Sequence, residues 1–244
     1  MERKKGERFT ICAMVFTVSI LGQAVLFGQE KKPENSAAKP VPKDKKRHEG
    51  FVELAKKGGI DVLFLGDSIT DGWRAPPGQE AWKKHFEPLH AANFGIGGDR
   101  TQHVLWRIEN GELEGIHPKL AVLMIGTNNL GANKDEQIAE GITAIVHEIH
   151  KRQPETKVLL LGIFPRSQKA SDPFRARIKD INKVIAKLDD GGKTVRYLDI
   201  GDKFVDKNGD LPKEIMPDYL HLSKAGYKIW ADAIQPTVDE MLKN

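Results

Sequence analysis

The sequence predicts an α/β protein in which a five-stranded parallel sheet is covered by helices on both faces. Short apolar runs lack polar alternation, which is typical of strands that are buried on both sides. Segments with apolar residues at helical spacing separate these runs, and turn-forming residues follow them. The predicted strands are residues 61–66, 91–94, 120–125, 158–161 and 195–200.

Helices are predicted between the strands and after the last one. The helix that follows the third strand carries a stripe of isoleucines at helical spacing, namely Ile138, Ile142, Ile145 and Ile149. Another begins at Asp172-Pro173, because aspartate is a favoured cap and proline suits the first helical position. The others are residues 51–57, 79–86, 101–108 and from 223 to about 242. The chain shows no internal repeat, so we expect a single folded domain.

The charge distribution argues against a nucleic-acid partner. The 244 residues carry a net charge of +4. Residues 1–49 contain eleven Lys or Arg against six Asp or Glu, so residues 50–244 carry a net charge of −1. The folded part is therefore not expected to present a basic face to nucleic acid. Cys12 is the one cysteine of the chain, which excludes an internal disulfide.

Residues 1–28 are predicted to be a signal peptide or an N-terminal anchor. A positively charged stretch, 1–8, precedes an apolar stretch, 9–21, and Gly22-Gln23-Ala24 fits a cleavage site. The alternative is an uncleaved anchor, because residues 9–27 are just long enough to span a bilayer. We expect cleavage and export to the periplasm or the medium, with membrane association only if the segment is uncleaved.

The part of the chain after this segment divides into a linker and a domain. Residues 29–49 are rich in Lys, Pro and Ala and contain few large apolar residues, so they are predicted to be a flexible linker. The folded domain is predicted to span residues 50–244.

Polar residues that follow the predicted strands can meet at one edge of the sheet, where α/β proteins bind ligands. Ser68 follows the first strand, Gly98 the second and Asn128 the third, while Asp218 and His221 share a loop after the fifth. A nucleophilic serine needs a base, and the base needs an acceptor that fixes its tautomer. An oxyanion needs preorganised donors, which two backbone N–H groups and a side-chain amide can supply.

Four blocks in chain order carry a family resemblance: Gly66-Asp67-Ser68-Ile69, Gly95-x-Gly97-Gly98, Gly126-x-Asn128 and Asp218-x-x-His221. They resemble the four blocks of the SGNH (GDSL) hydrolases, and residues 89–129 are similar to the platelet-activating-factor acetylhydrolase branch of that family. The resemblance covers about residues 50–244. It implies a flavodoxin-like three-layer α/β/α sandwich and ester hydrolysis without a metal or another cofactor.

The resemblance also implies a role for each of these residues. Ser68 matches the nucleophile, His221 the base and Asp218 the partner of the base. Gly98 and Asn128 match the residues that join the nucleophile in the oxyanion hole.

A small acyl pocket walled by Ile69, Thr127 and Leu220 is a further implication of the resemblance, and it favours a short acyl group such as acetyl. The similar enzymes are cytosolic dimers that act on a phospholipid ester. Predicted export favours an acetylated polysaccharide instead, and a homodimer is possible. Two alternatives stay open, namely an acyltransferase acting on a sugar hydroxyl and a secreted glycan- or lipid-binding module without catalysis.

Four further residues are weighed against structural roles. Asp67 is expected to anchor the turn before Ser68 through hydrogen bonds to nearby backbone. His147 and His150 lack a third metal ligand, so they are expected on a solvated helix face. Trp73 could line the mouth of the site or belong to the core.

Overall fold

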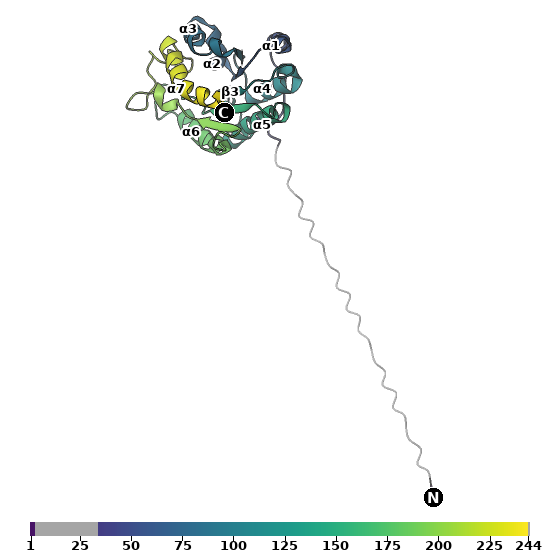
Figure 1. Cartoon of the computed structure of the whole chain (residues 1–244). Coiled ribbons are helices and arrows are strands. Elements are labelled where there is room, and N and C mark those ends of the chain that lie inside the picture. Colours follow the sequence, from purple (N-terminus) through teal and green to yellow (C-terminus); the bar gives the residue numbers. More distant parts are fainter. Residues whose placement is uncertain (3–33, 244) are drawn as a thin grey trace. The chain divides into compact units, whose positions relative to one another are not determined.

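The computed structural model describes residues 1–2 and 34–243, and residues 34–243 belong to one compact unit. Figure 1 shows this unit as a sheet with helices on both sides. Residues 3–28 of the predicted signal peptide or anchor and residues 29–33 of the predicted linker lie outside the described residues. None of the helices within the described ranges has the length and apolar character needed to cross a bilayer.

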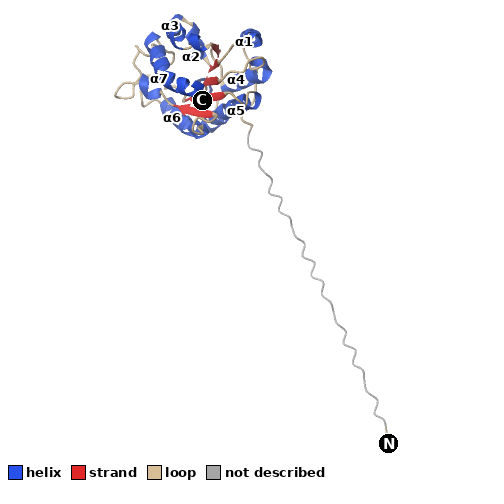
Figure 2. Ribbon diagram, viewed as in Figure 1, coloured by secondary structure: helices blue, strands red, loops and turns tan. Residues whose placement is uncertain are grey.

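The sheet has five strands in the order β2-β1-β3-β4-β5, and every neighbouring pair is parallel. Figure 2 shows the strands in the middle of the unit with helices around them. The strands are β1 (Val62–Gly66), β2 (Ala91–Gly95), β3 (Leu120–Met124), β4 (Lys157–Leu161) and β5 (Val195–Leu198). This arrangement confirms the predicted α/β fold. The three central strands β1, β3 and β4 are almost wholly buried, which explains why their sequences lack polar alternation.

Seven α-helices occur in the described part of the chain. They are α1 (Lys45–Lys57), α2 (Ser68–Asp71), α3 (Pro76–His85), α4 (Thr101–Arg107), α5 (Asp135–Arg152), α6 (Pro173–Ile185) and α7 (Lys224–Lys243). Alternate residues of β1 enter two separate cores. Leu63 and Leu65 pack with apolar residues of α1, α4, α5 and α6, whereas Phe64 packs with residues of α7 on the opposite face. The sheet is therefore the middle layer of three.

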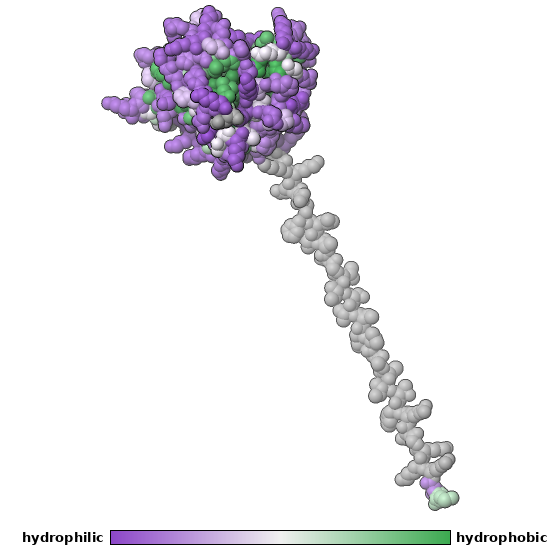
Figure 3. Space-filling model, in the orientation of Figure 1, coloured by the Kyte–Doolittle hydropathy of each residue, from purple (hydrophilic) through white to green (hydrophobic). Residues whose placement is uncertain are grey.

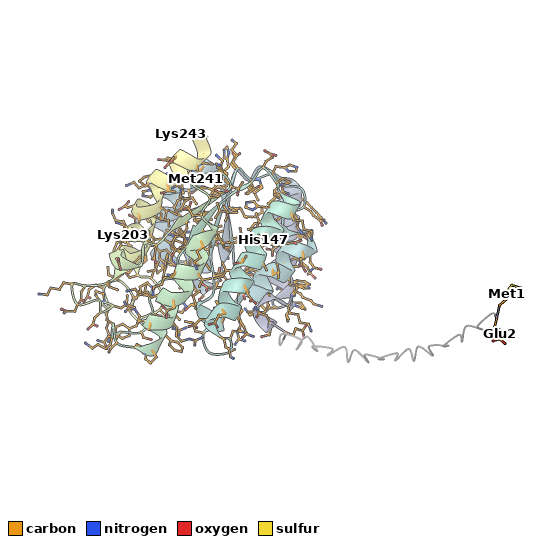
Figure 4. The ribbon with its side chains drawn as sticks, turned by 90° about the horizontal axis from the view of Figure 1, so that it is seen from below. Met1, Glu2, His147, Lys203, Met241 and Lys243 are labelled. Atoms are coloured by element: carbon orange, nitrogen blue, oxygen red, sulfur yellow. The ribbon has the colours of Figure 1, made fainter. Side chains whose placement is uncertain are left out.

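The surface agrees with this division between core and solvent. The face drawn in Figure 3 is largely hydrophilic, with apolar residues gathered in small patches. At the C-terminal end of α7, Met241 is buried, and exposed Lys243 ends the helix (Figure 4).

The predicted linker is corrected by the structure over its described part, residues 34–49. A short 3₁₀ helix, η1 (Ser36–Ala38), buries Ala37, whose carbonyl accepts a hydrogen bond from Thr101 Oγ1 at 2.7 Å. Helix α1 begins before the predicted position 51 because Asp44 caps it, accepting the Arg47 N–H at 3.1 Å. The folded unit begins at Glu34 rather than at residue 50.

Candidate active site

The nucleophile position is built where β1 passes into α2. Gly66 ends the strand, and a Cβ placed on it would lie 2.1 Å from Thr70 Oγ1 and 2.5 Å from the Met124 carbonyl oxygen. Only glycine allows this approach, so the chain can turn at once into a short helix whose first residue is Ser68. The Ser68 N–H has no intrahelical acceptor at this position. The Ser68 side chain is half-buried at the carboxyl end of the sheet.

Asp67 holds this turn. Its Oδ1 accepts the Ile69 N–H at 3.0 Å, which caps α2 as expected from the sequence. The carboxyl is fully buried, and burial raises the pKa of Asp67 to about 7. Its Oδ2 has no hydrogen-bond partner among the described residues. Asp67 is therefore a turn anchor that carries a proton in much of the acid range.

His221 and Asp218 come from the loop before α7 and meet Ser68 from the far end of the sequence. His221 Nε2 lies 2.9 Å from Ser68 Oγ, and His221 Nδ1 lies 2.7 Å from Asp218 Oδ2. The three predicted side chains thus form one hydrogen-bonded row. Tyr219, which lies between Asp218 and His221 in the sequence, adopts a left-handed φ of 61°.

The environment of Asp218 favours its ionised form. Partial burial raises the pKa of this carboxyl, but hydrogen bonds from the His221 ring and from the backbone N–H groups of His221 and Leu220 lower it by more. Its Oδ1 accepts those backbone N–H groups at 2.7 and 3.1 Å. Asp218 is consequently an anion held in place through Oδ1, and its second oxygen, Oδ2, orients the imidazole of His221.

The glycine-rich loop after β2 lies against Ser68. A Cβ placed on Gly97 would be 3.9 Å from Ser68 Cβ, and Gly98 adopts a φ of 72° that favours glycine. Asn128 reaches the same loop from the end of β3, because its Nδ2 donates to the Asp99 carbonyl at 2.9 Å. The structure therefore places the loop at Gly97 against Ser68 and ties Asn128 to the same loop. The oxyanion-hole roles of Gly98 and Asn128 stay predictions.

The predicted acyl-pocket residues take different positions around this centre. Ile69 and Thr127 are 1% exposed, and Leu220 is half-buried. The Ile69 carbonyl accepts from Tyr227 Oη at 2.7 Å, and Thr127 accepts from Arg166 at 3.2 Å through its carbonyl. Each residue is adjacent in sequence to a member of the site, but their role in holding an acyl group stays a prediction.

Sequence reasoning missed a buried ionic cluster behind the glycine-rich loop. Asp99 Oδ2 accepts from Arg107 Nε at 3.0 Å, and Arg107 also pairs with Glu112. Glu112 in turn contacts His48 Nδ1 at 3.1 Å. All four are less than 10% exposed, and no short motif reveals them because their partners come from different elements.

The remaining candidates have structural roles. Trp73 is 1% exposed and packs against Tyr227 and Trp230, so it belongs to the core rather than to the mouth of the site. His147 is exposed on α5, in agreement with a solvated face (Figure 4). The same expectation is wrong for His150, which is half-buried and whose Nε2 is buried without a hydrogen-bond partner among the described residues. Within residues 1–2 and 34–243, no three His, Cys, Asp or Glu side chains are grouped so as to hold a metal ion. The expectation of a cofactor-free enzyme stays a prediction.

Comparison with known proteins identifies the family of the chain. The sequence profile of the GDSL-like lipase/acylhydrolase family matches residues 64–229. The chain belongs to this family. It is 42% identical over 202 residues to platelet-activating factor acetylhydrolase IB subunit alpha1 of Homo sapiens, covering 80% of this chain and 85% of the relative. It is 44% identical over 181 residues to the alpha2 subunit of Rattus norvegicus, covering 74% and 77%.

Solved structures of other proteins share the fold. A GDSL-like lipase from Bacteroides thetaiotaomicron has a TM-score of 0.61 at 20% identity, covering 81% of this chain and 98% of that one. An acetyl xylan esterase has a TM-score of 0.61 at 24% identity, covering 73% and 100%. Family membership, together with these relatives, makes the chain a carboxylic ester hydrolase.

Proposed function

We propose that the protein removes short acyl groups, acetyl first among them, from ester substrates through an acyl-enzyme on Ser68. The observation that carries this proposal is the row in which His221 lies 2.9 Å from Ser68 Oγ and 2.7 Å from Asp218. These distances are those required of a nucleophile, a general base and the group that orients the base.

The chemistry follows from the positions of these atoms. Ser68 Oγ attacks the ester carbonyl carbon while its proton moves to His221 Nε2. The resulting oxyanion is stabilised by the N–H groups of Ser68 and Gly98 and by the Asn128 amide. As the tetrahedral intermediate collapses, His221 returns the proton to the departing alcohol. Water then attacks the acyl-enzyme by the same route and releases the acid and free Ser68.

A short acyl group is favoured by the resemblance and by relatives. Ile69 and Thr127 match the residues that wall a small acyl pocket in the similar enzymes. The relatives that are more than 40% identical carry the name acetylhydrolase. Their named substrate is platelet-activating factor, whereas the predicted export signal favours an acetylated polysaccharide. Export and homodimer formation stay predictions from the N-terminal sequence and the resemblance.

The test is hydrolysis of p-nitrophenyl acetate by the wild-type protein and the Ser68→Ala variant. The variant should lose turnover, apart from background, while unfolding at the same temperature as the wild type. Full turnover by a folded Ser68→Ala variant would refute the proposal.

The natural substrate class is tested with the same pair of proteins. Acetylxylan and platelet-activating factor are the two substrates to compare, with acetate release as the readout. Products formed in the presence of an added acceptor alcohol separate hydrolysis from acyl transfer, because transfer yields a new ester instead of acetate.

A further inference from the structure

Lys43 connects the N-terminal segment to the glycine-rich loop of the site. It precedes α1, and its Nζ donates a hydrogen bond to the Gly97 carbonyl and pairs with Asp99 Oδ1 at 3.2 Å. A Cβ placed on Gly98 would lie 3.4 Å from the same nitrogen. The Lys43 side chain is 34% exposed, so the ammonium is partly withdrawn from water at this contact.

The Gly97 carbonyl and the Gly98 N–H belong to the same peptide group. A cation that binds the carbonyl oxygen draws electron density from that group and makes its N–H a stronger donor. A hydrogen bond from a charged donor is also stronger than one between neutral groups, so it restrains the orientation of the peptide. Lys43 can therefore act on the oxyanion through the Gly98 amide, without contacting the substrate.

We propose that Lys43 is a positioning residue that orients and polarises the Gly97–Gly98 peptide for oxyanion stabilisation. This inference rests on the proposed function. It assigns a part in catalysis to a segment whose composition is typical of a flexible linker.

The surroundings of the loop make the effect of Lys43 separable from folding. When Lys43 is replaced, Asp99 still has its ion pair with Arg107, at 3.0 Å. Arg107 likewise still has its ion pair with Glu112. The loop backbone is also held by Asn128 Nδ2 at the Asp99 carbonyl. Loss of Lys43 thus leaves no buried carboxylate without a partner, and we expect the fold to survive it.

The experiment measures kcat and KM for p-nitrophenyl acetate in the full chain carrying Lys43→Met, with Lys43→Arg as the conservative variant. Lys39→Met is the matched control, because Lys39 lies in the same segment and pairs with exposed Glu34. Lys43→Met should lower kcat about tenfold with KM within about twofold, since the interaction strengthens as charge develops. Lys43→Arg should recover most of the loss, and Lys39→Met should equal the wild type.

A second measurement is independent of turnover. The amide proton of Gly98 should shift upfield in Lys43→Met, because the peptide loses its cation, and should return in Lys43→Arg. If Lys43→Met fails to fold, Lys43→Gln replaces it in both measurements, since glutamine keeps a neutral donor for the carbonyl.

The outcomes separate this inference from the proposed function. An unchanged kcat, a change in KM alone, or an unmoved Gly98 amide would overturn the role of Lys43 while Ser68→Ala remained inactive. Turnover by a folded Ser68→Ala variant would instead overturn the proposed function itself.

Discussion

Asn128 Nδ2 donates to the Asp99 carbonyl at 2.9 Å, so a side-chain amide joins the segment after β3 to the glycine-rich loop after β2. One amide hydrogen is used in this bond, and we propose that the other donates to the oxyanion. Replacement of Asn128 by alanine should lower kcat by roughly 10²–10³ with little change in KM, because such a donor acts mainly in the transition state.

Steady-state hydrolysis of p-nitrophenyl acetate checks this effect. Asn110→Ala is a matched control, since exposed Asn110 makes the same kind of bond, from Nδ2 to the Trp106 carbonyl at 2.7 Å, in the π-helical segment Ile108–Glu112. Equal losses in the two variants would show that the Asn128 amide has no special part.

Asp218→Asn should lower kcat by roughly 10³–10⁴. Oδ1 of residue 218 accepts two backbone N–H groups, so an asparagine oxygen is expected to stay there and its NH₂ group to face His221 Nδ1. The neutral imidazole would then carry its proton on Nε2, and a protonated Nε2 cannot accept the proton of Ser68.

The control for this change is Asp61→Asn. Asp61 Oδ2 contacts His90 Nδ1 at 2.8 Å in a second carboxylate–histidine pair of the same kind. The kcat of the Asp61→Asn variant should match that of the wild type. Comparable kcat values for Asp218→Asn and the wild type would remove Asp218 from the account.

Asp67 should make stability fall as pH rises through the weakly acidic range. Burial raises its pKa to about 7 from the ordinary value of 3.8. Between these values the folded protein holds a proton that the unfolded chain has released, so the free energy of unfolding decreases with pH by up to about 1.4 kcal/mol per unit. The contribution is complete below about pH 4 and lost above about pH 7.

Asp67→Asn keeps the cap on α2 and removes this titration. Urea unfolding of both proteins from about pH 5 to pH 7 should show the variant gaining stability relative to the wild type as pH rises. A constant difference across that range would contradict the raised pKa of Asp67.

Leu220→Ala should widen the acyl specificity. Leu220 is half-buried beside His221, and removing its side chain leaves space for one or two further methylene groups. The ratio of kcat/KM for p-nitrophenyl butyrate to that for the acetate should rise about tenfold. Leu54→Ala is the control, because Leu54 is an exposed residue of α1. An unchanged ratio in Leu220→Ala would show that the acyl group does not contact Leu220.

The sheet could be predicted closely from the sequence because its strands owe their character to local composition. Buried parallel strands such as Leu120–Met124 need an uninterrupted apolar run, which is visible without knowledge of partners. The site residues follow those strands, so their shared edge could be predicted as well.

The N-terminal segment could not be predicted in this way, because its order depends on distant partners. Asn35 Nδ2 donates to the Gln137 carbonyl at 2.9 Å, and Thr101 bonds to the Ala37 carbonyl. A composition poor in large apolar residues gives no sign of such backbone contacts. The position of Trp73 could not be predicted either, because a tryptophan shortly after the nucleophile can line the mouth of the site or pack in the core.

The most direct test of the central claim is peptide mapping after inactivation by diethyl p-nitrophenyl phosphate, which phosphorylates an activated serine irreversibly. The account predicts one diethylphosphoryl group per chain, on Ser68, in proportion to lost activity, and a much slower reaction in Asp218→Asn. Inactivation with the label on another residue, or stoichiometric labelling of Ser68 with full activity retained, would contradict it.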